Sequence, residues 1–139
     1  DPINVELFMN IIKELKEKGT SIIFSSHRME HVELFCEKLV ILVHGKSVLQ
    51  GSLKEIKKAY RKKNIHIKAQ LDVEKIKKIK GVEEVSQNAE DYVIKISSDE
   101  YIENVFKEIK NCKNVTEFRV EDPTLNEIFL NKVGVVYEN

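Results

Sequence analysis

The order of apolar patterns after residue 63 constrains the fold more than any other feature of the sequence. Between Ile65 and Leu71, apolar residues alternate with polar ones, which predicts a strand with one buried face. Asp72 then precedes apolar residues at helical spacing, and Gly81 ends that stretch. A strand followed directly by a short helix is the first half of a β-α-β unit.

The remaining elements of this region complete a recognisable order. The sequence next predicts a hairpin with strands over 82–86 and 92–97. A helix follows, which Ser97 and Glu100 cap and which runs to residue 109, and then a strand over 116–120. Pro123-Thr124 opens a last helix, and Glu127 completes its capping box. The order is β-α-β-β-α-β plus a terminal helix. This is the split βαβ arrangement called ferredoxin-like, and it predicts an α+β domain over residues 63–139.

The first 62 residues carry a different pattern, in which helical stretches alternate with short, unbroken apolar runs. Asp1 and Pro2 predict the start of a helix that Gly19 ends. The run Ile22–Phe24 predicts a strand buried on both faces of a parallel sheet. This region is therefore predicted to be α/β.

A hairpin and two short helices complete the α/β region. The sequence predicts a helix over 29–36, a strand over 39–43, a His44-Gly45 turn with a returning strand over 46–49, and a helix over 53–62 that Ser52 and Glu55 cap. We place the boundary between the two predicted domains at residues 62 and 63, inside a charged stretch.

Charge is unevenly spread, although the net charge is zero. Residues 54–80 hold eleven Lys or Arg and three Asp or Glu, whereas residues 81–139 hold six and thirteen. A basic segment can face a phosphate-rich partner. The alternative, which we favour, is that the acidic end of the chain complements it.

Two short motifs suggest chemistry that their contexts do not support. His27, Glu30 and His31 fit the H-x-x-E-H zinc signature. His27, however, follows a predicted strand instead of lying on a helix, and the chain is short for a catalytic cleft. Gly45-Lys46-Ser47 resembles the end of a P-loop, but Val40 stands where the first glycine belongs and a strand follows instead of a helix. We expect no metal site and no P-loop in this chain.

The other candidate residues have simpler explanations. Tyr92 lies on the predicted sheet, but the paired aromatic residues that bind RNA bases are absent, so we expect no nucleic-acid partner. Cys36 and Cys112 are far apart in the sequence, which is typical of two reduced thiols in a cytosolic protein.

The segment over residues 1–60 resembles the end of an ABC-transporter ATPase domain. In that family an "LDP" turn, the D-loop, is followed by a helix, and then by a strand ending in a switch histidine. A segment close to "DRI" comes next, before two spaced glycines. Here "DP" at residues 1–2, "SSH" at 25–27, "CEKLVIL" at 36–42, and glycines 45 and 51 stand in that order. Glu37 and Lys38 replace the commoner Asp-Arg pair.

The C-terminal segment extends this resemblance. ABC ATPase subunits of bacterial exporters can carry an extra C-terminal domain that ends in a "PSLEEIF"-like segment, which "PTLNEIF" at residues 123–129 resembles. The fold implied is the C-terminal part of a P-loop-type ABC ATPase domain followed by a ferredoxin-like domain.

The resemblance implies a role for three residues. His27 would be the switch histidine that contacts the γ-phosphate of ATP, Asp1 would act across the dimer as part of the D-loop, and Ser26 would shape the turn before His27. The Walker A, signature and Walker B motifs do not occur in these 139 residues. We therefore expect the chain to belong to a longer ATP-hydrolysing subunit and to be inactive alone.

The resemblance also implies ligands, partners and location. The full subunit would use ATP and Mg²⁺, pair with a second ATPase subunit, bind a membrane-spanning permease, and lie on the cytoplasmic face of the membrane. Two alternatives stay open, namely a stand-alone ferredoxin-like regulatory or ligand-binding module, and a zinc hydrolase. We also expect the apolar segment 20–25 to be exposed where it lacks neighbouring strands.

Overall fold

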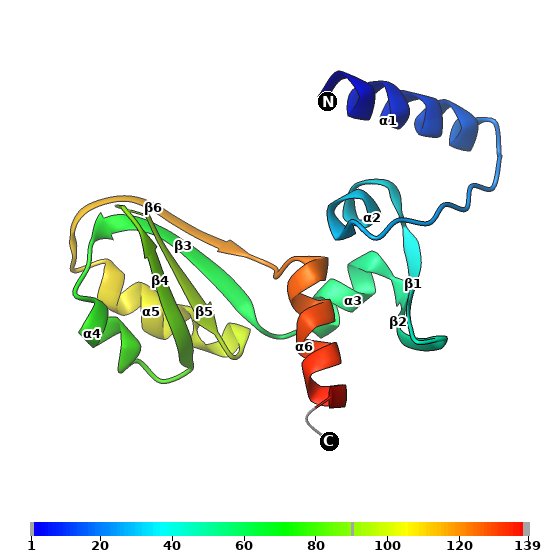
Figure 1. Ribbon diagram of the computed structural model, residues 1–139. Coiled ribbons are helices and arrows are strands. Elements are labelled where there is room, and N and C mark those ends of the chain that lie inside the picture. Colours follow the sequence, from blue (N-terminus) through cyan, green and yellow to red (C-terminus); the bar gives the residue numbers. More distant parts are fainter. Residues whose placement is uncertain (1, 90, 138–139) are drawn as a thin grey trace. The chain divides into compact units, whose positions relative to one another are not determined.

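The computed structural model of the protein describes residues 2–89 and 91–137, and these form two compact units. The first unit comprises residues 1–54 with 129–139, and the second comprises residues 55–128. Figure 1 shows the elements of each unit. Among the described residues, no helix combines the length and the apolar character needed to cross a membrane.

The first unit contains helices and one hairpin. Its elements are α1 (Pro2–Glu17), α2 (Met29–Phe35), β1 (Lys38–Val43) and β2 (Lys46–Ser52), and α3 (Leu53–Ala59) begins directly after Ser52. Gly19 follows α1 with φ of 78°, a left-handed conformation that glycine adopts without steric cost. The predicted end of the first helix is therefore confirmed.

Strands β1 and β2 are joined by the turn that the sequence predicted. His44 and Gly45 have φ of 49° and 77°. Two successive positive φ values define a turn whose twist matches that of antiparallel strands. The pairing is antiparallel from Lys38 opposite Ser52 to Val43 opposite Lys46. Strand β2 is longer than predicted because it continues through Gly51.

The predicted strand over Ile22–Phe24 is wrong for this structure. The chain is extended there but pairs with no described strand, and Ile23 is 98% exposed. A strand exists only through hydrogen bonds to a neighbour, and in this unit β1 and β2 pair only with each other. The exposure agrees with the expectation for an apolar segment without neighbouring strands.

The second unit is built around a four-stranded sheet in the order β4-β5-β3-β6, in which every neighbouring pair is antiparallel. Its elements are β3 (Lys63–Gln70), α4 (Val73–Lys77), β4 (Val82–Asn88), β5 (Asp91–Ile96), α5 (Ile102–Ile109) and β6 (Lys113–Glu121), and α6 (Leu125–Tyr137) follows. Strand β6 starts three residues earlier than predicted.

The core of this unit lies between the sheet and helices α4 and α5. The side chains that are no more than 1% exposed in this core are Ile65 and Ile67 of β3, Ile94 and Ile96 of β5, Ile76 of α4, and Val105 and Ile109 of α5. Complete burial of one such side chain contributes about 1.5–3 kcal/mol. The alternation predicted from Ile65 onward is confirmed, since His66 and Lys68 point away from this core.

Two of the predicted helix caps are present in the structure. Asp72 accepts a hydrogen bond from the backbone N–H of Lys75, and Thr124 Oγ1 accepts one of 3.2 Å from the backbone N–H of Glu127. The carboxylate of Glu127 also accepts two bonds, of 3.2 and 3.0 Å, from Nδ2 of the buried Asn64. These contacts attach the start of α6 to β3.

The capping box of Ser97 and Glu100 is a wrong prediction. A short 3₁₀ turn over Asp99–Tyr101 precedes α5, and the Ser98 side chain at the capping position accepts no hydrogen bond from a backbone N–H of the turn. The hydroxyl of Ser98 instead donates to the Asp99 carboxylate at 3.2 Å. The hydroxyl thus acts as a donor to a neighbouring side chain and does not cap the helix.

The basic segment is complemented by the acidic end of the chain, as favoured from the sequence. Three lysines of residues 54–80 form ion pairs with residues from 81–139, namely Lys62 with Glu83 at 2.9 Å, Lys63 with Asp122 at 2.6 Å and Lys68 with Asp91 at 3.5 Å. All these partners are partly exposed, so each pair contributes at most about 1 kcal/mol.

Candidate functional site

His27 lies at the point where the extended segment 20–26 bends into helix α2. Its side chain is exposed. Ser26 Oγ accepts a 3.0 Å hydrogen bond from the backbone N–H of Arg28, so a side chain closes the turn around His27. This bond holds the backbone while the imidazole projects into solvent. The third residue of the predicted site, Asp1, lies outside the described residues.

An open, mainly apolar groove of about 510 Å³ lies beside this turn. Its lining residues are Asn4, Val5, Phe8, Phe24, Ser25, Ser26, Arg28, His31 and Phe35. Phe35 packs edge-on against two other rings, with centroids 4.9 Å from Phe8 and 5.9 Å from Phe24. The aromatic cluster thus positions the segment that leads to His27 against α1 and α2.

His31 does not join His27 in a metal site. Its ring lies 6.0 Å from that of Phe35, as part of the aromatic cluster. Over residues 2–89 and 91–137, no group of three His, Cys, Asp or Glu side chains is placed to hold a metal ion. His27 itself presents an exposed imidazole beside the aromatic cluster.

Lys16 and Glu37 join α1 to the start of β1 through an ion pair. The hydrogen bond from Lys16, and then its charge, hold the pKa of the Glu37 carboxyl below its ordinary value. Burial raises the pKa of the neighbouring Cys36 thiol, which therefore stays protonated at neutral pH. Glu37, at the position of the commoner aspartate, is thus paired with Lys16 of α1.

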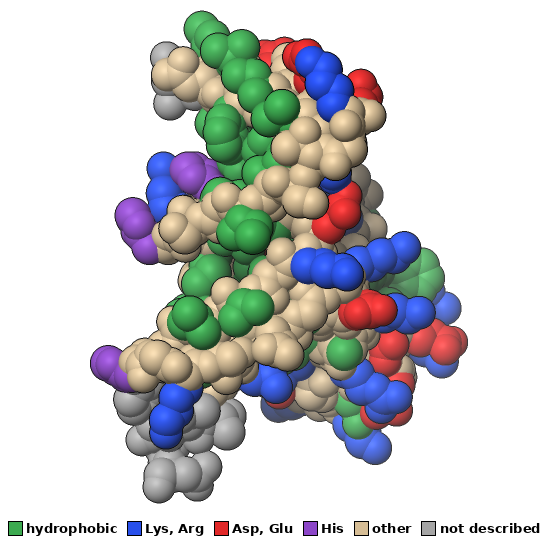
Figure 2. Space-filling view, turned by 90° about the vertical axis from the view of Figure 1, so that its right-hand side faces the viewer, with side chains coloured by type: hydrophobic (Ala, Val, Ile, Leu, Met, Phe, Trp, Pro, Cys, Tyr) green, Lys and Arg blue, Asp and Glu red, His purple; other side chains and the backbone are tan. Residues whose placement is uncertain are grey.

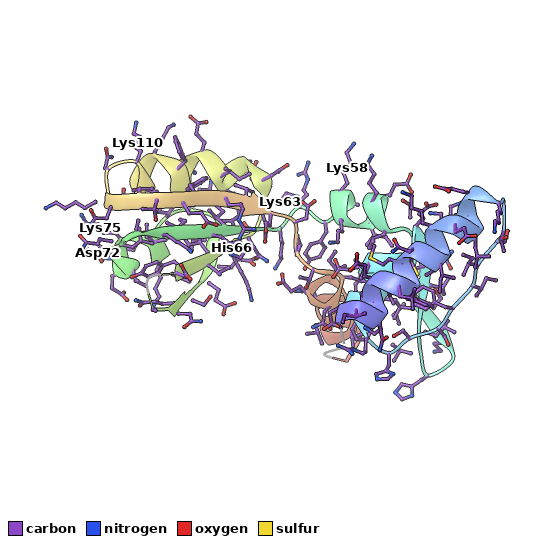
Figure 3. The ribbon with its side chains drawn as sticks, turned by 90° about the horizontal axis from the view of Figure 1, so that it is seen from above. Lys58, Lys63, His66, Asp72, Lys75 and Lys110 are labelled. Carbon is purple, nitrogen blue, oxygen red and sulfur yellow. The ribbon has the colours of Figure 1, made fainter. Side chains whose placement is uncertain are left out.

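The sequence missed a charged hollow on the second unit. It has a volume of about 200 Å³ and is lined by His66, Ile67, Lys68, Asp91, Tyr92, Glu117 and Arg119. His66 lies on β3 (Figure 3), and its Nε2 is 2.9 Å from Glu121 Oε2. The hydrogen bond and charge of Arg119 lower the pKa of Glu117. Only strand register brings these residues together, so no local pattern could have found them.

Residues 51–133 match the family described as "ATP-binding protein DrrA1-3-like, C-terminal domain". The chain belongs to this family of ABC transporter ATP-binding proteins. The matched range begins within β2 and includes the whole four-stranded sheet. The resemblance drawn from the sequence is therefore confirmed.

Curated relatives extend the match over the first unit as well. The chain is 41% identical over 138 residues to the ABC transporter ATP-binding protein YhaQ of Bacillus subtilis, covering 99% of this chain and 46% of that protein. It is 41% identical over 137 residues to an ABC transporter ATP-binding protein of Alkalihalophilus pseudofirmus, covering 99% of this chain and 51% of that protein. The mouse glucosylceramide transporter ABCA12 is 30% identical over 156 residues, across 100% of this chain and 6% of its own length.

The chain spans about half the length of the first two relatives. Both of its units lie inside the matched region, so the two units occur together in ABC transporter ATP-binding proteins. This finding favours the ATPase-subunit hypothesis over the stand-alone module.

Proposed function

We propose that this chain acts as the C-terminal part of an ATP-binding subunit that couples ATP binding and hydrolysis to transport, in the direction of export. The relatives over 99% of the chain are ABC transporter ATP-binding proteins, and this observation carries the proposal. The 139 residues alone do not hydrolyse ATP under this proposal, because the phosphate-cradling and water-activating motifs of the family are not among them.

His27 is proposed as the switch histidine of the subunit. Its place at the end of an extended segment, its exposure and the turn closed by Ser26 suit an imidazole that donates a hydrogen bond to the γ-phosphate of ATP. A hydrogen bond to a charged group contributes about 1.5–3 kcal/mol. Applied to the transition state, that corresponds to a rate factor of about 10 to 150.

The remaining ligands and partners follow from the same proposal. ATP binds with Mg²⁺ in the complete subunit, Asp1 contributes to the D-loop across the dimer, and a second ATPase subunit and a membrane-spanning permease complete the transporter. The subunit then lies on the cytoplasmic face of the membrane.

Residues 63–139 are proposed to be a ferredoxin-like accessory domain following the ATPase portion at residues 1–62. The strand order β4-β5-β3-β6, with all neighbours antiparallel and two helices packed on the core face, supports this arrangement. We assign to this domain a contact with the second ATPase subunit, because the described hollow on its sheet is small and its charged groups are already paired.

The test is a His27→Ala substitution in the full-length subunit, assembled with its permease. ATP hydrolysis is expected to fall about 10- to 150-fold, by the energies given above. His44→Asn is the matched control, because His44 is also an exposed histidine in a turn and asparagine tolerates its φ of 49°. A His27→Ala subunit that hydrolyses ATP at the normal rate would overturn the assignment.

A further inference from the structure

Strand β6 forms one edge of the four-stranded sheet, and no described strand pairs with its outer side (Figure 1). Nine residues make it the longest of the described strands. Its pairing with β3 is regular from Glu117 to Glu121. An exposed, regular edge presents unpaired N–H and C=O groups, which can bind another strand.

The side chains of β6 alternate between two kinds of surface. Phe118 and Val120 lie opposite Ile67 and Ile65 of β3, so they are on the face of the helices. Glu117 and Arg119 point to the other face, where Arg119 Nε lies 3.0 Å from Glu117 Oε1. One edge thus carries an apolar row and a charged row.

The apolar row remains incompletely covered. The ring of Phe118 packs edge-on against Phe106 of α5, with centroids 5.1 Å apart. Phe106 is nevertheless 48% exposed, and Val120 is 37% exposed. A strand added at this edge would cover these side chains.

We propose that β6 pairs antiparallel with β6 of a second copy of this chain, about a two-fold axis at Phe118. In this register Phe118 faces the partner's Phe118, and Glu117 faces the partner's Arg119 in both directions. Val120 lies opposite the partner's Thr116, which makes a pair of β-branched residues. Opposite charges and aromatic pairs directly across two strands are stabilising, so the segment Thr116–Val120 complements itself.

The other edge of the sheet lacks this property. Strand β4 carries no basic residue. Centred on Val85, two copies would place Glu84 opposite the partner's Ser86, with no compensating charge. The comparison selects β6 as the edge that binds a second copy.

The pairing is expected to be weak in solution. Stable protein interfaces bury about 1,200–2,000 Å² in total, and one strand pair with its flanking side chains buries less. The inference rests on the proposed function in one respect, because a transporter that holds two subunits together raises their effective concentration to the millimolar range. The edge contact would then be formed in the assembly.

The experiment measures self-association of the 139-residue chain by sedimentation up to about 1 mM, without nucleotide. Glu117→Arg and Arg119→Glu each place like charges across the axis and are expected to weaken dimerisation at least about fivefold. An equimolar mixture of the two variants should restore it, because each acidic pair then faces a basic pair. The double variant E117R/R119E should also dimerise.

The mixture separates contacts between copies from contacts within one strand. Each single variant still lacks its own Glu117–Arg119 pair in the mixture, so restored association can come only from the partner. Circular dichroism checks that the variants fold, and Glu117→Gln and Arg119→Gln replace any reversal that does not.

Two results would overturn the edge pairing, namely a wild-type chain that stays monomeric up to about 1 mM, or single variants whose mixture associates no better than either alone. Neither result bears on His27, since no ATP is present. Conversely, loss of the switch-histidine assignment would leave the edge pairing intact.

Discussion

In residues 55–128, six isoleucines of the sheet and its helices are no more than 1% exposed (Ile65, Ile67, Ile76, Ile94, Ile96 and Ile109), whereas in residues 1–54 Ile23 is 98% exposed. Among the described residues of the first unit, Ile12 and Leu39 are the buried hydrophobic side chains, at 9% and 8%. Figure 2 shows hydrophobic side chains gathered on the surface of the part that holds α1. Both units have apolar stretches, but only one closes a core over them.

The difference follows from the number of strands. Four strands give a face wide enough for two helices to cover, so α4 and α5 seal the apolar row of β3 and β5. The first unit has a two-stranded hairpin, and such a hairpin is marginally stable by itself. Large exposed apolar patches are typical of surfaces that bind another protein, a membrane or a ligand. We therefore expect substitutions of buried residues in the second unit to lower the free energy of unfolding. Most substitutions in the first unit should change it as little as surface substitutions do.

The largest expected effect is a truncation in the closed core. Ile94→Ala should lower the free energy of unfolding by about 2–5 kcal/mol, because it removes buried methyl groups and leaves a cavity. Ile23→Ala, the matched substitution in the first unit, should change it by less than about 0.5 kcal/mol. Urea denaturation followed by far-ultraviolet circular dichroism measures both, because each unit contains helices and strands. Similar losses at the two positions would remove the contrast between the units.

A smaller effect is expected from two glycines that share a positive φ. Gly81 has φ of 90°, and a Cβ added there would overlap the Tyr101 ring close to its attachment point. Gly19 has φ of 78° and no neighbouring atom within 4 Å of an added Cβ. Gly81→Ala should cost about 2–4 kcal/mol from the backbone conformation and overpacking, and Gly19→Ala about 1–2 kcal/mol from the backbone alone.

Thermal and urea unfolding of the two alanine variants sharpen the comparison. If Gly81→Ala proved no more harmful than Gly19→Ala, Tyr101 would have room to move, and the second unit would be less tightly packed than its burial indicates.

The smallest expected effect concerns the Lys16–Glu37 ion pair on the first unit. Lys16 lowers the pKa of Glu37 from its ordinary value of 4.5. A lowered carboxyl pKa stabilises the folded state above pH 4.5, and that stabilisation is lost as pH falls through the folded pKa. Lys16→Met should raise the pKa of Glu37 toward 4.5. The variant should then lose less folding stability than the wild type when the pH falls through the folded pKa.

Carboxyl carbon NMR titration measures that change directly. Glu117, whose pKa is lowered chiefly by Arg119, is the control in the same spectrum and should not move in Lys16→Met. An unchanged Glu37 pKa would show that the ion pair is not populated in solution.

Much of this architecture could be read from local sequence patterns. Asp72 and Thr124 predicted helix starts because a short polar side chain satisfies a backbone N–H within three residues. His44-Gly45 predicted the hairpin because both residues tolerate positive φ. The alternation after Ile65 predicted the buried face of β3. Each of these is a property of a few consecutive residues.

Other features depended on residues distant in the sequence. The run Ile22–Phe24 has strand composition but forms no strand, because a strand requires a partner that this unit does not provide. His66 meets Glu121, and Phe118 comes to the sheet edge, only through the register of β3 and β6. The sequence determined the local elements and the family, whereas the tertiary structure decided which apolar and charged side chains are covered, because burial and strand pairing depend on neighbours far along the chain.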